Sequence, residues 1–283
     1  MSDDTPTRRY RTIWISDLHL GTRGCRSAEL LDFLRAHDSD TLYLVGDLID
    51  GWSLRKTWWW PQAHNDVVQK LLRKARKGTR VVFLPGNHDE FARGYVGQAF
   101  GGIEVLPDTM HRTADGKTLW VLHGDAFDPV VTKHRWLVPI AHGFLGVLRW
   151  LHIPTAWRLV RPLLGRPYRS LATFVKGQAN QAMAALGDFE RLAVEGARRR
   201  GADGVVCGHV HVPAMRTVDG ILYCNDGDWV DSCTALVEHQ DGRLELLRWT
   251  LRKAPPTEPP PAKTRPRDPH PSKRLLEAAG QVH

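Results

Sequence analysis

Five short motifs rich in metal-ligating residue types are distributed along most of this 283-residue chain. They are Asp17-Leu-His19, Gly46-Asp47-Leu-Ile-Asp50, Gly86-Asn87-His88-Asp89, His123-Gly-Asp125 and Gly208-His209-Val-His211. Their carboxylate, amide and imidazole groups are ligands of divalent cations. Two such cations roughly 3.5–4 Å apart can activate a water and neutralise both the attacking and the leaving oxygens of a displacement at phosphorus. The set is therefore typical of a two-metal site that hydrolyses phosphoesters.

Individual positions suit this chemistry. Asp17 and His19 are two residues apart at the end of a predicted strand, so their side chains point the same way and can bind one ion. Asp47 has two carboxylate oxygens and can bridge two ions, and Asn87 adds a carbonyl oxygen. Three further imidazoles come from His123, His209 and His211.

Each motif follows a short apolar run that predicts a buried strand. Helical patterns at residues 28–36 and 66–77 separate the first three runs, so strands and helices alternate. We expect the loops at the carboxyl ends of these strands to gather at one end of a single sheet. The predicted strands are residues 12–15, 41–45, 80–84, 119–122 and 204–207.

The order and composition of the motifs resemble the calcineurin-like metallophosphoesterase superfamily over about residues 11–250. The resemblance implies an α/β fold, a four-layer α/β/β/α sandwich, with two divalent cations that we expect to be Mn²⁺. By motif position, one ion would take Asp17, His19, Asp47 and His211, and the second would take Asp47, Asn87, His123 and His209.

The same resemblance gives catalytic roles to His88 and Asp89. His88 would lie beside the substrate phosphate and stabilise or protonate the leaving oxygen, while Asp89 would orient its imidazole. A single displacement of this kind needs no nucleophilic Ser or Cys. Supporting positions around the ligands, rather than ligand positions, are expected for Asp50, Asp125 and Asn225.

The chain divides into a metallophosphoesterase domain at residues 10–250 and a Pro-rich, basic tail at 251–283 that predicts disorder. The stretch between His123 and Gly208 is longer than one crossover needs, and it predicts a helical cap insertion at about 128–200. Within it, residues 136–164 are apolar but interrupted by prolines, which favours short broken helices. Hairpin turns are predicted at the Asp-Gly pairs 115–116, 219–220 and 241–242.

Composition limits the class of protein. No apolar run reaches the 18 or so residues of a membrane span. The four cysteines form no Cys-x-x-Cys pair and no signal peptide begins the chain, so we expect a cytoplasmic protein with reduced thiols. Residues 126–200 hold twelve Lys or Arg against four Asp or Glu, which makes the expected cap the basic part of a chain whose net charge is +8.

A cap that is both basic and apolar fits a phosphorylated amphiphile or nucleotide substrate, and peripheral contact with the cytoplasmic face of the inner membrane. Its apolar residues could equally form only the interior of the cap. Within the superfamily, the chain most resembles the UDP-2,3-diacylglucosamine diphosphatase branch, which implies hydrolysis of a nucleotide lipid to UMP and a lipid 1-phosphate. The well-studied members carry Arg where this chain has His88. Substrate positioning is expected from Arg23, Arg169 and Lys176.

Two other functions remain as alternatives. Basic charge also fits a phosphodiesterase acting on cyclic nucleotides or nucleic acid, and the run Trp58-Trp59-Trp60 could stack a base. A structural role is expected for at least two of the three, because neighbouring indoles on an extended segment point opposite ways and some of them therefore pack inward. The third function is a catalytically silent, metal-bearing scaffold.

Overall fold

The computed structural model describes residues 8–127 and 171–250, with side chains described from residue 185 onward in the second range. Both ranges belong to one compact unit, Met1–Leu251. The expected tail at 251–283 and the greater part of the expected cap, residues 128–170, lie outside the described residues.

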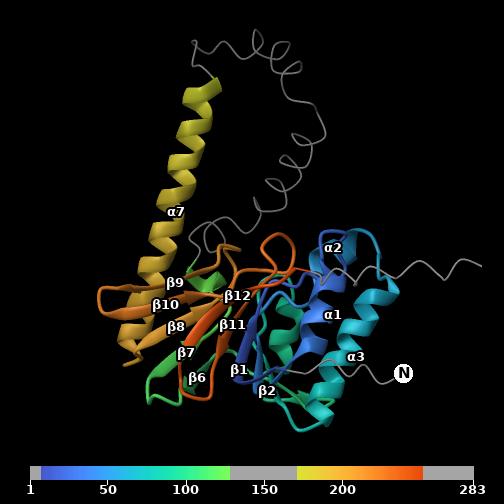
Figure 1. Cartoon of the computed structure of the whole chain (residues 1–283). Coiled ribbons are helices and arrows are strands. Elements are labelled where there is room, and N and C mark those ends of the chain that lie inside the picture. Colours follow the sequence, from blue (N-terminus) through green and yellow to red (C-terminus); the bar gives the residue numbers. More distant parts are fainter. Residues whose placement is uncertain (1–7, 128–170, 251–283) are drawn as a thin grey trace, which may run out of the picture. The chain divides into compact units, whose positions relative to one another are not determined.

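Twelve strands of the described chain form two mixed sheets (Figure 1). The first has the order β12-β11-β1-β2-β3-β5-β4 and consists of β1 (Arg8–Ile15), β2 (His37–Leu44), β3 (Arg80–Phe83), β4 (Ala99–Phe100), β5 (Ile103–Val105), β11 (Thr234–Glu238) and β12 (Leu244–Arg248). The second has the order β6-β7-β8-β10-β9 and consists of β6 (Thr109–Arg112), β7 (Thr118–Val121), β8 (Gly204–Cys207), β9 (Ala214–Val218) and β10 (Ile221–Asn225).

The helices of the described chain lie between these strands in sequence. They are α1 (Ser27–Ala36), α2 (Gly51–Lys56), α3 (Gln62–Arg76) and α7 (Leu171–Arg199), with the 3₁₀ helices η1 (Glu90–Tyr95) and η2 (Asp125–Phe127). The five predicted strands and the two predicted helices are all present. The three Asp-Gly turns are confirmed as well, since they join the antiparallel pairs β6–β7, β9–β10 and β11–β12.

The expectation of a single sheet is wrong. The strands β1, β2 and β3 pair in parallel in the first sheet, whereas β7 and β8 pair in parallel in the second. An apolar run predicts a buried strand but does not specify its partner, because parallel partners are distant in sequence. The five motif loops therefore meet from two sheets rather than along one edge.

Alternation along the strands builds three hydrophobic layers. On β1, Ile13 and Ile15 face α1 and α3, while Trp14 between them faces the second sheet. On β7, Val121 faces the first sheet and Trp120 faces α7. The resulting order of layers is helix, sheet, sheet, helix.

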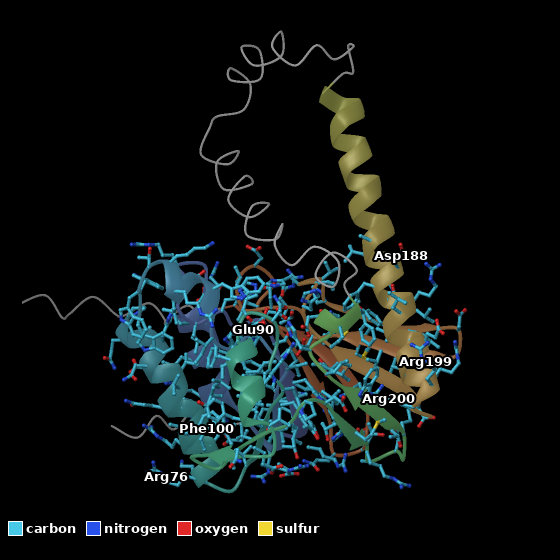
Figure 2. The ribbon with its side chains drawn as sticks, turned by 180° about the vertical axis from the view of Figure 1, so that it is seen from behind. Arg76, Glu90, Phe100, Asp188, Arg199 and Arg200 are labelled. Carbon is cyan, nitrogen blue, oxygen red and sulfur yellow. The ribbon has the colours of Figure 1, made fainter. Side chains whose placement is uncertain are left out.

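The outer layer on the second sheet is the C-terminal half of α7. Phe189 and Ala193 pack there against β8 and β10, so the end of the range expected as cap forms part of the α/β core. Figure 2 shows Arg199 and Arg200 where this helix ends, and the guanidinium of Arg200 lies 3.9 Å from the ring centre of Trp120. Within the described residues, no helix is both long and apolar enough to span a membrane.

Candidate metal centre

The predicted ligands all follow strand ends and come together between the two sheets. Asp17 and His19 follow β1, Asp47 follows β2 and Asn87 follows β3, each in the first sheet. From the second sheet, His123 follows β7, and His209 and His211 follow β8. Most of these side chains are buried, with His209 and His211 half-buried.

Backbone conformation is unusual at the same positions. Among the described residues, seven other than glycine have positive φ, and five of them are predicted ligands. This left-handed region is uncommon for non-glycine residues, although Asp and His enter it more readily than most. Such strain persists where the surrounding structure enforces it, and it clusters at functional sites. The five are Asp17, His19, Asp47, His209 and His211.

The glycines that begin two of the motifs allow close approach of ligand side chains to the backbone. A Cβ on Gly86 would overlap the Asp47 carboxylate and lie 2.7 Å from His123 Nε2. A Cβ on Gly208 would overlap the side chain of Asp17. Both glycines are therefore required by the packing of the site.

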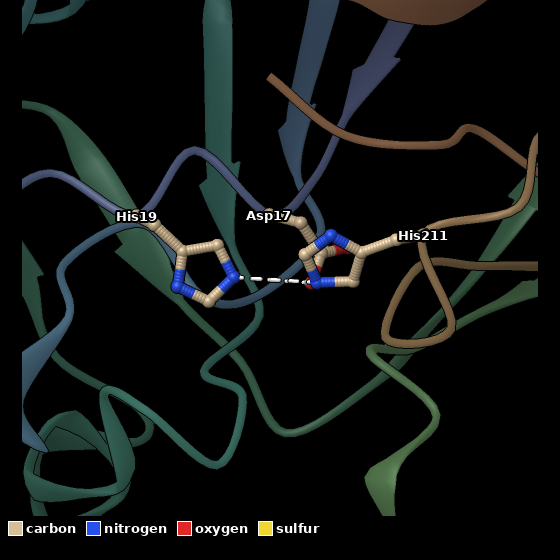
Figure 3. A group of neighbouring side chains, drawn as sticks. All are labelled: Asp17, His19 and His211. Atoms are coloured by element: carbon tan, nitrogen blue, oxygen red, sulfur yellow. Dashed lines mark hydrogen bonds and ion pairs between the residues drawn. The ribbon is translucent and has the colours of Figure 1, made fainter. Parts of the chain in front are cut away.

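Asp17, His19 and His211 form the first half-site (Figure 3). The Nε2 atoms of His19 and His211 face each other 3.4 Å apart, and Asp17 Oδ1 lies 3.1 Å from His211 Nε2 and 3.8 Å from His19 Nε2. The other oxygen, Asp17 Oδ2, accepts a hydrogen bond from the amide of His209 at 2.9 Å. Asp17 Oδ1 is buried and lies close to both imidazole rings.

Asn87, His123 and His209 form the second half-site. Asn87 Oδ1 lies 3.2 Å from His123 Nε2 and 3.1 Å from His209 Nδ1. The Nδ1 of His123 donates to the Val45 carbonyl at 2.9 Å, which leaves its Nε2 lone pair directed into the site.

Asp47 lies between the two half-sites. Its Oδ2 is 3.4 Å from His123 Nε2 and 3.9 Å from His19 Nε2, while its Oδ1 accepts from the amide of His88 at 2.8 Å. Burial alone would raise the pKa of Asp47, but the imidazoles of His123 and His19 outweigh burial and hold the pKa well below its usual range. The carboxylate is therefore ionised and can be shared between two cations.

The donor set fits divalent cations. Three groups of His and Asp side chains each present ligand atoms within 4.8 Å of one another. Carboxylate and imidazole donors of this kind suit Mn²⁺, Fe²⁺, Zn²⁺ and Mg²⁺ to different degrees. Burial disfavours a charged His211, yet the carboxylates of Asp17 and Asp228 outweigh it and raise the pKa of His211 to about 10. The carboxylates around His211 therefore favour positive charge at this position.

His88 contacts Asp50 and not Asp89. Its Nδ1 lies 3.1 Å from Asp50 Oδ2, and its Nε2 points inward, 4.0 Å from Asp47 Oδ2. The indole of Trp52 covers the imidazole, with ring centres 4.1 Å apart. Burial opposes charge on this ring, but Asp50 and Asp47 outweigh burial and raise the pKa of His88.

The predicted role of Asp89 as the partner of His88 is therefore wrong. The Asp89 carboxylate accepts from the amides of Leu48 at 2.7 Å, Ile49 at 3.3 Å and Gly86 at 2.7 Å. It fastens the loop after β2 to the loop after β3. Burial first, and the charge of Asp47 second, raise the pKa of Asp89 to about 6. One oxygen accepts from the amide of Gly86 in its own turn, and the other accepts from the amides of Leu48 and Ile49 in the loop after β2.

The three expected supporting residues have different partners. Asp50 contacts His88 and also lies 3.4 Å from His19 Nδ1, and Asn225 donates to the Gly208 carbonyl at 2.7 Å. Asp125 instead pairs with Arg93 at 2.7 Å.

Two residues of the site were missed from the sequence. Asp228 Oδ2 lies 3.2 Å from His211 Nδ1, and Trp52 covers His88. The sequence signal was the acidic stretch Asn225-Asp226-Gly227-Asp228 directly after a strand, a setting like that of the five motifs.

The structure describes the side chain of only one of the three predicted substrate-binding residues. The guanidinium of Arg23 lies 5.5 Å from the ring centre of Trp59. Lys176 lies in α7 ahead of its described side chains, and Arg169 lies outside the described residues. Trp59 and Trp60 are half-buried and contact His64 edge-on, and Trp60 packs against the hydrophobic core, while Trp58 is 76% exposed.

Comparison with known proteins identifies the family. The model of the calcineurin-like phosphoesterases matches residues 10–213. A UDP-2,3-diacylglucosamine hydrolase of Xanthomonas campestris pv. campestris is 31% identical over 247 residues, which cover 83% of this chain and 98% of that protein. A UDP-2,3-diacylglucosamine hydrolase of Nitrosococcus oceani is 34% identical over 223 residues, which cover 74% of this chain and 82% of that protein.

Among solved structures, Yfce, a phosphoesterase from E. coli, is 15% identical and aligns with a TM-score of 0.39 over 83% of this chain and 97% of that chain. A Vps29 mutant from Entamoeba histolytica is 14% identical, with a TM-score of 0.38 over 84% of this chain and 97% of that chain. The assignment therefore rests on the sequence matches together with the His and Asp clusters. The chain belongs to the calcineurin-like phosphoesterases, and it is a metal-dependent hydrolase.

Proposed function

We propose that this protein hydrolyses the diphosphate of a nucleotide lipid, UDP-2,3-diacylglucosamine, to UMP and a lipid 1-phosphate. The observation that carries the proposal is the match to UDP-2,3-diacylglucosamine hydrolases over about four-fifths of the chain, with 31% identity. The complete set of seven predicted ligands around one space supports it.

The first ion would be held by the first half-site with Asp47, and the second ion by the second half-site with Asp47. When bound, two such cations polarise a phosphoryl oxygen and lower the pKa of water. The protein excludes competing solvent at the ligands, because Asp17, Asp47 and His123 are buried. It also fixes the donor atoms in advance, through the backbone contacts to Asp17 Oδ2 and Asp47 Oδ1.

His88 would stabilise or protonate the leaving oxygen. Its Nε2 points into the site and its Nδ1 is held by Asp50, so a proton on Nε2 is presented to the substrate. Burial opposes charge on the ring, but Asp50 and Asp47 raise the pKa of His88, which favours the protonated form that general-acid catalysis requires.

Substrate positioning is assigned to Arg23, Arg169 and Lys176. Support is strongest for Arg23, because it follows His19 by four residues and its guanidinium is held over Trp59. A cation at this position can pair with a diphosphate oxygen.

We further propose that the protein works at the cytoplasmic face of the inner membrane as a peripheral protein. Support comes from the segment after α2, where Trp58 is 76% exposed and Arg55 and Lys56 are exposed beside it. Trp favours the interface between lipid and water, and basic residues favour anionic headgroups. The enzyme would then meet an amphiphilic substrate at the membrane surface in which that substrate resides.

A second candidate function is a phosphodiesterase acting on cyclic nucleotides or nucleic acid. The presence of His88 favours it, because this residue places the site closer to the wider superfamily. Such an enzyme would turn over without lipid or detergent, and its affinity for nucleic acid would fall with rising salt.

The test compares two substrates with the purified full-length protein and Mn²⁺. One is UDP-2,3-diacylglucosamine in detergent and the other is bis-p-nitrophenyl phosphate, with Asp47→Ala as the inactive control. We expect a much higher kcat/KM for the lipid, with UMP as a product. Cleavage of the generic diester alone would refute the lipid assignment and favour the second candidate. Activity retained in metal-loaded Asp47→Ala would refute the two-metal mechanism.

A further inference from the structure

The segment between α2 and α3 contains three consecutive tryptophans, Trp58, Trp59 and Trp60 (Figure 1). The backbone is extended on both sides of them, with φ −148° and ψ 119° at Thr57 and φ −71° and ψ 160° at Pro61. A proline also restricts the residue before it, here Trp60, to extended conformations. Residues two positions apart on an extended segment lie on the same side of it, so Trp58 and Trp60 share one side.

The indoles of Trp58 and Trp60 are nearly parallel and widely spaced. Their ring centres lie 6.4 Å apart, and the angle between their planes is 27°. Flat rings in contact lie ~3.5 Å apart, so a third flat ring inserted between two others needs about 7 Å. The observed spacing is close to that value. Trp58 is also 76% exposed, so most of its indole surface is accessible to a ligand.

The two indoles differ in how firmly they are held. Trp60 packs against the hydrophobic core and contacts the buried His64 edge-on, with ring centres 5.5 Å apart. Trp58 is exposed, and exposed side chains change rotamer readily. A ring inserted between them would therefore lie on a fixed surface and be covered by a side chain that can adjust to it.

The tryptophan segment is fastened to the loop that carries a predicted metal ligand. His64 Nδ1 accepts a hydrogen bond from the amide of Gly21 at 2.9 Å, and Gly21 follows His19 by two residues. Two residues further along, the guanidinium of Arg23 lies 5.5 Å from the ring centre of Trp59. One loop thus connects the indoles to the metal centre and to a cation suited to phosphate.

We propose that Trp58 and Trp60 form a clamp that stacks on both faces of the base of a nucleotide substrate. A nucleobase is flat, and it is joined to phosphate groups that the ions and Arg23 would bind. The proposal rests on the proposed function in requiring a nucleotide substrate, and it places the uracil of the UDP group in the clamp. The outer face of Trp58 stays free, which is compatible with contact between Trp58 and the membrane.

The test measures the binding of UMP and of ribose phosphate, the same molecule without its base, to the Mn²⁺-loaded full-length protein by isothermal titration calorimetry. Neither lipid nor detergent is present, so membrane binding by Trp58 does not enter the measurement. UMP should bind more tightly than ribose phosphate. Trp58→Ala should weaken UMP binding roughly 5- to 150-fold and leave ribose phosphate binding unchanged. Trp58→Phe should keep most of the UMP affinity, because it keeps a flat ring.

Trp60→Leu tests the other side of the clamp, because it keeps an apolar contact with the core and removes the flat ring. It should lose UMP affinity as Trp58→Ala does, with Tm measured to show that the variant folds. Phe100→Ala, which removes an exposed aromatic ring on β4, is the control and should bind UMP as the wild type does.

Two results would overturn the clamp. One is a wild-type protein that shows no preference for UMP over ribose phosphate, and the other is an unchanged UMP affinity in Trp58→Ala. Hydrolysis of the lipid is measured separately, by the assay given under the proposed function. A protein that does not cut the lipid but binds UMP through Trp58 would therefore refute the lipid assignment and support the clamp.

Discussion

Replacement of Asp89 by Ala should destabilise the fold rather than disable His88. The substitution leaves the buried amides of Leu48, Ile49 and Gly86 without their acceptor. An unpaired buried donor costs at least about 1 kcal/mol, so the three together cost about 3 kcal/mol. For a domain of this size 1 kcal/mol corresponds to roughly 2–4 °C, so Tm should fall by about 6–12 °C.

The variant Asp50→Ala distinguishes a structural role of Asp89 from a role in orienting His88. Asp50 contacts His88 and also accepts from the amide of Ser53 at the start of α2, where a lost cap costs about 1 kcal/mol. Asp50→Ala should therefore lower kcat more and Tm less than Asp89→Ala, in thermal scans and in rates measured well below either Tm. An Asp89→Ala protein with unchanged Tm, and with kcat reduced as far as in Asp50→Ala, would refute the assignment of Asp89 as a structural clamp.

Three further substitutions test other parts of the molecule. Glu238→Gln should destabilise the protein by about 3 kcal/mol at neutral pH, because Glu238 is buried 2.8 Å from His111. The pKa of Glu238 is lowered in the folded protein, so this stability is present above about pH 4.3 and is lost as pH falls through the folded pKa. Tm should therefore depend less on pH in the variant. Gly208→Ala should abolish Mn²⁺ binding, because the new Cβ overlaps the side chain of Asp17, as titration of the metal-free protein would record. Trp58→Ala should weaken binding to anionic vesicles roughly 60-fold in sedimentation assays, since burying ~100 Å² of indole contributes about 2.5 kcal/mol.

Each of these has a matched control. Asp241→Asn changes an exposed acid near Glu238 in sequence and should leave the pH dependence of Tm unaltered. Gly187→Ala adds a Cβ in open space and should leave Mn²⁺ binding intact. Phe100→Ala removes another exposed aromatic, on β4, and should not affect vesicle binding. Equal effects in variant and control would contradict the corresponding prediction.

The strands and the positions of the candidate ligands at their ends could be predicted because both are local signals. A run such as residues 80–84 is apolar and ends in Gly86-Asn87-His88, so the strand and its chemistry are adjacent in the chain. The assignment of each strand to one of the two sheets was not predictable in the same way, because the paired strands β7 and β8 are separated by a stretch of more than 80 residues. The orientation of a side chain in a turn was not predictable either. Asp89 accepts hydrogen bonds from backbone amides, whereas Asp50, which precedes His88 by 38 positions, contacts the His88 ring.

Five of the predicted ligands have left-handed backbone conformations, and within the described residues local rules of backbone preference fail most often at this site. Each such residue costs of order 1 kcal/mol or more, and the cost is repeated at Asp17, His19, Asp47, His209 and His211. The same turns bring ionised carboxylates together in a buried space, which adds electrostatic repulsion. Neither cost stabilises the fold, and both are offset when cations bind the folded state, since a ligand that binds only the native protein stabilises it. We therefore propose that ion binding, rather than folding, accounts for the geometry of the five turns.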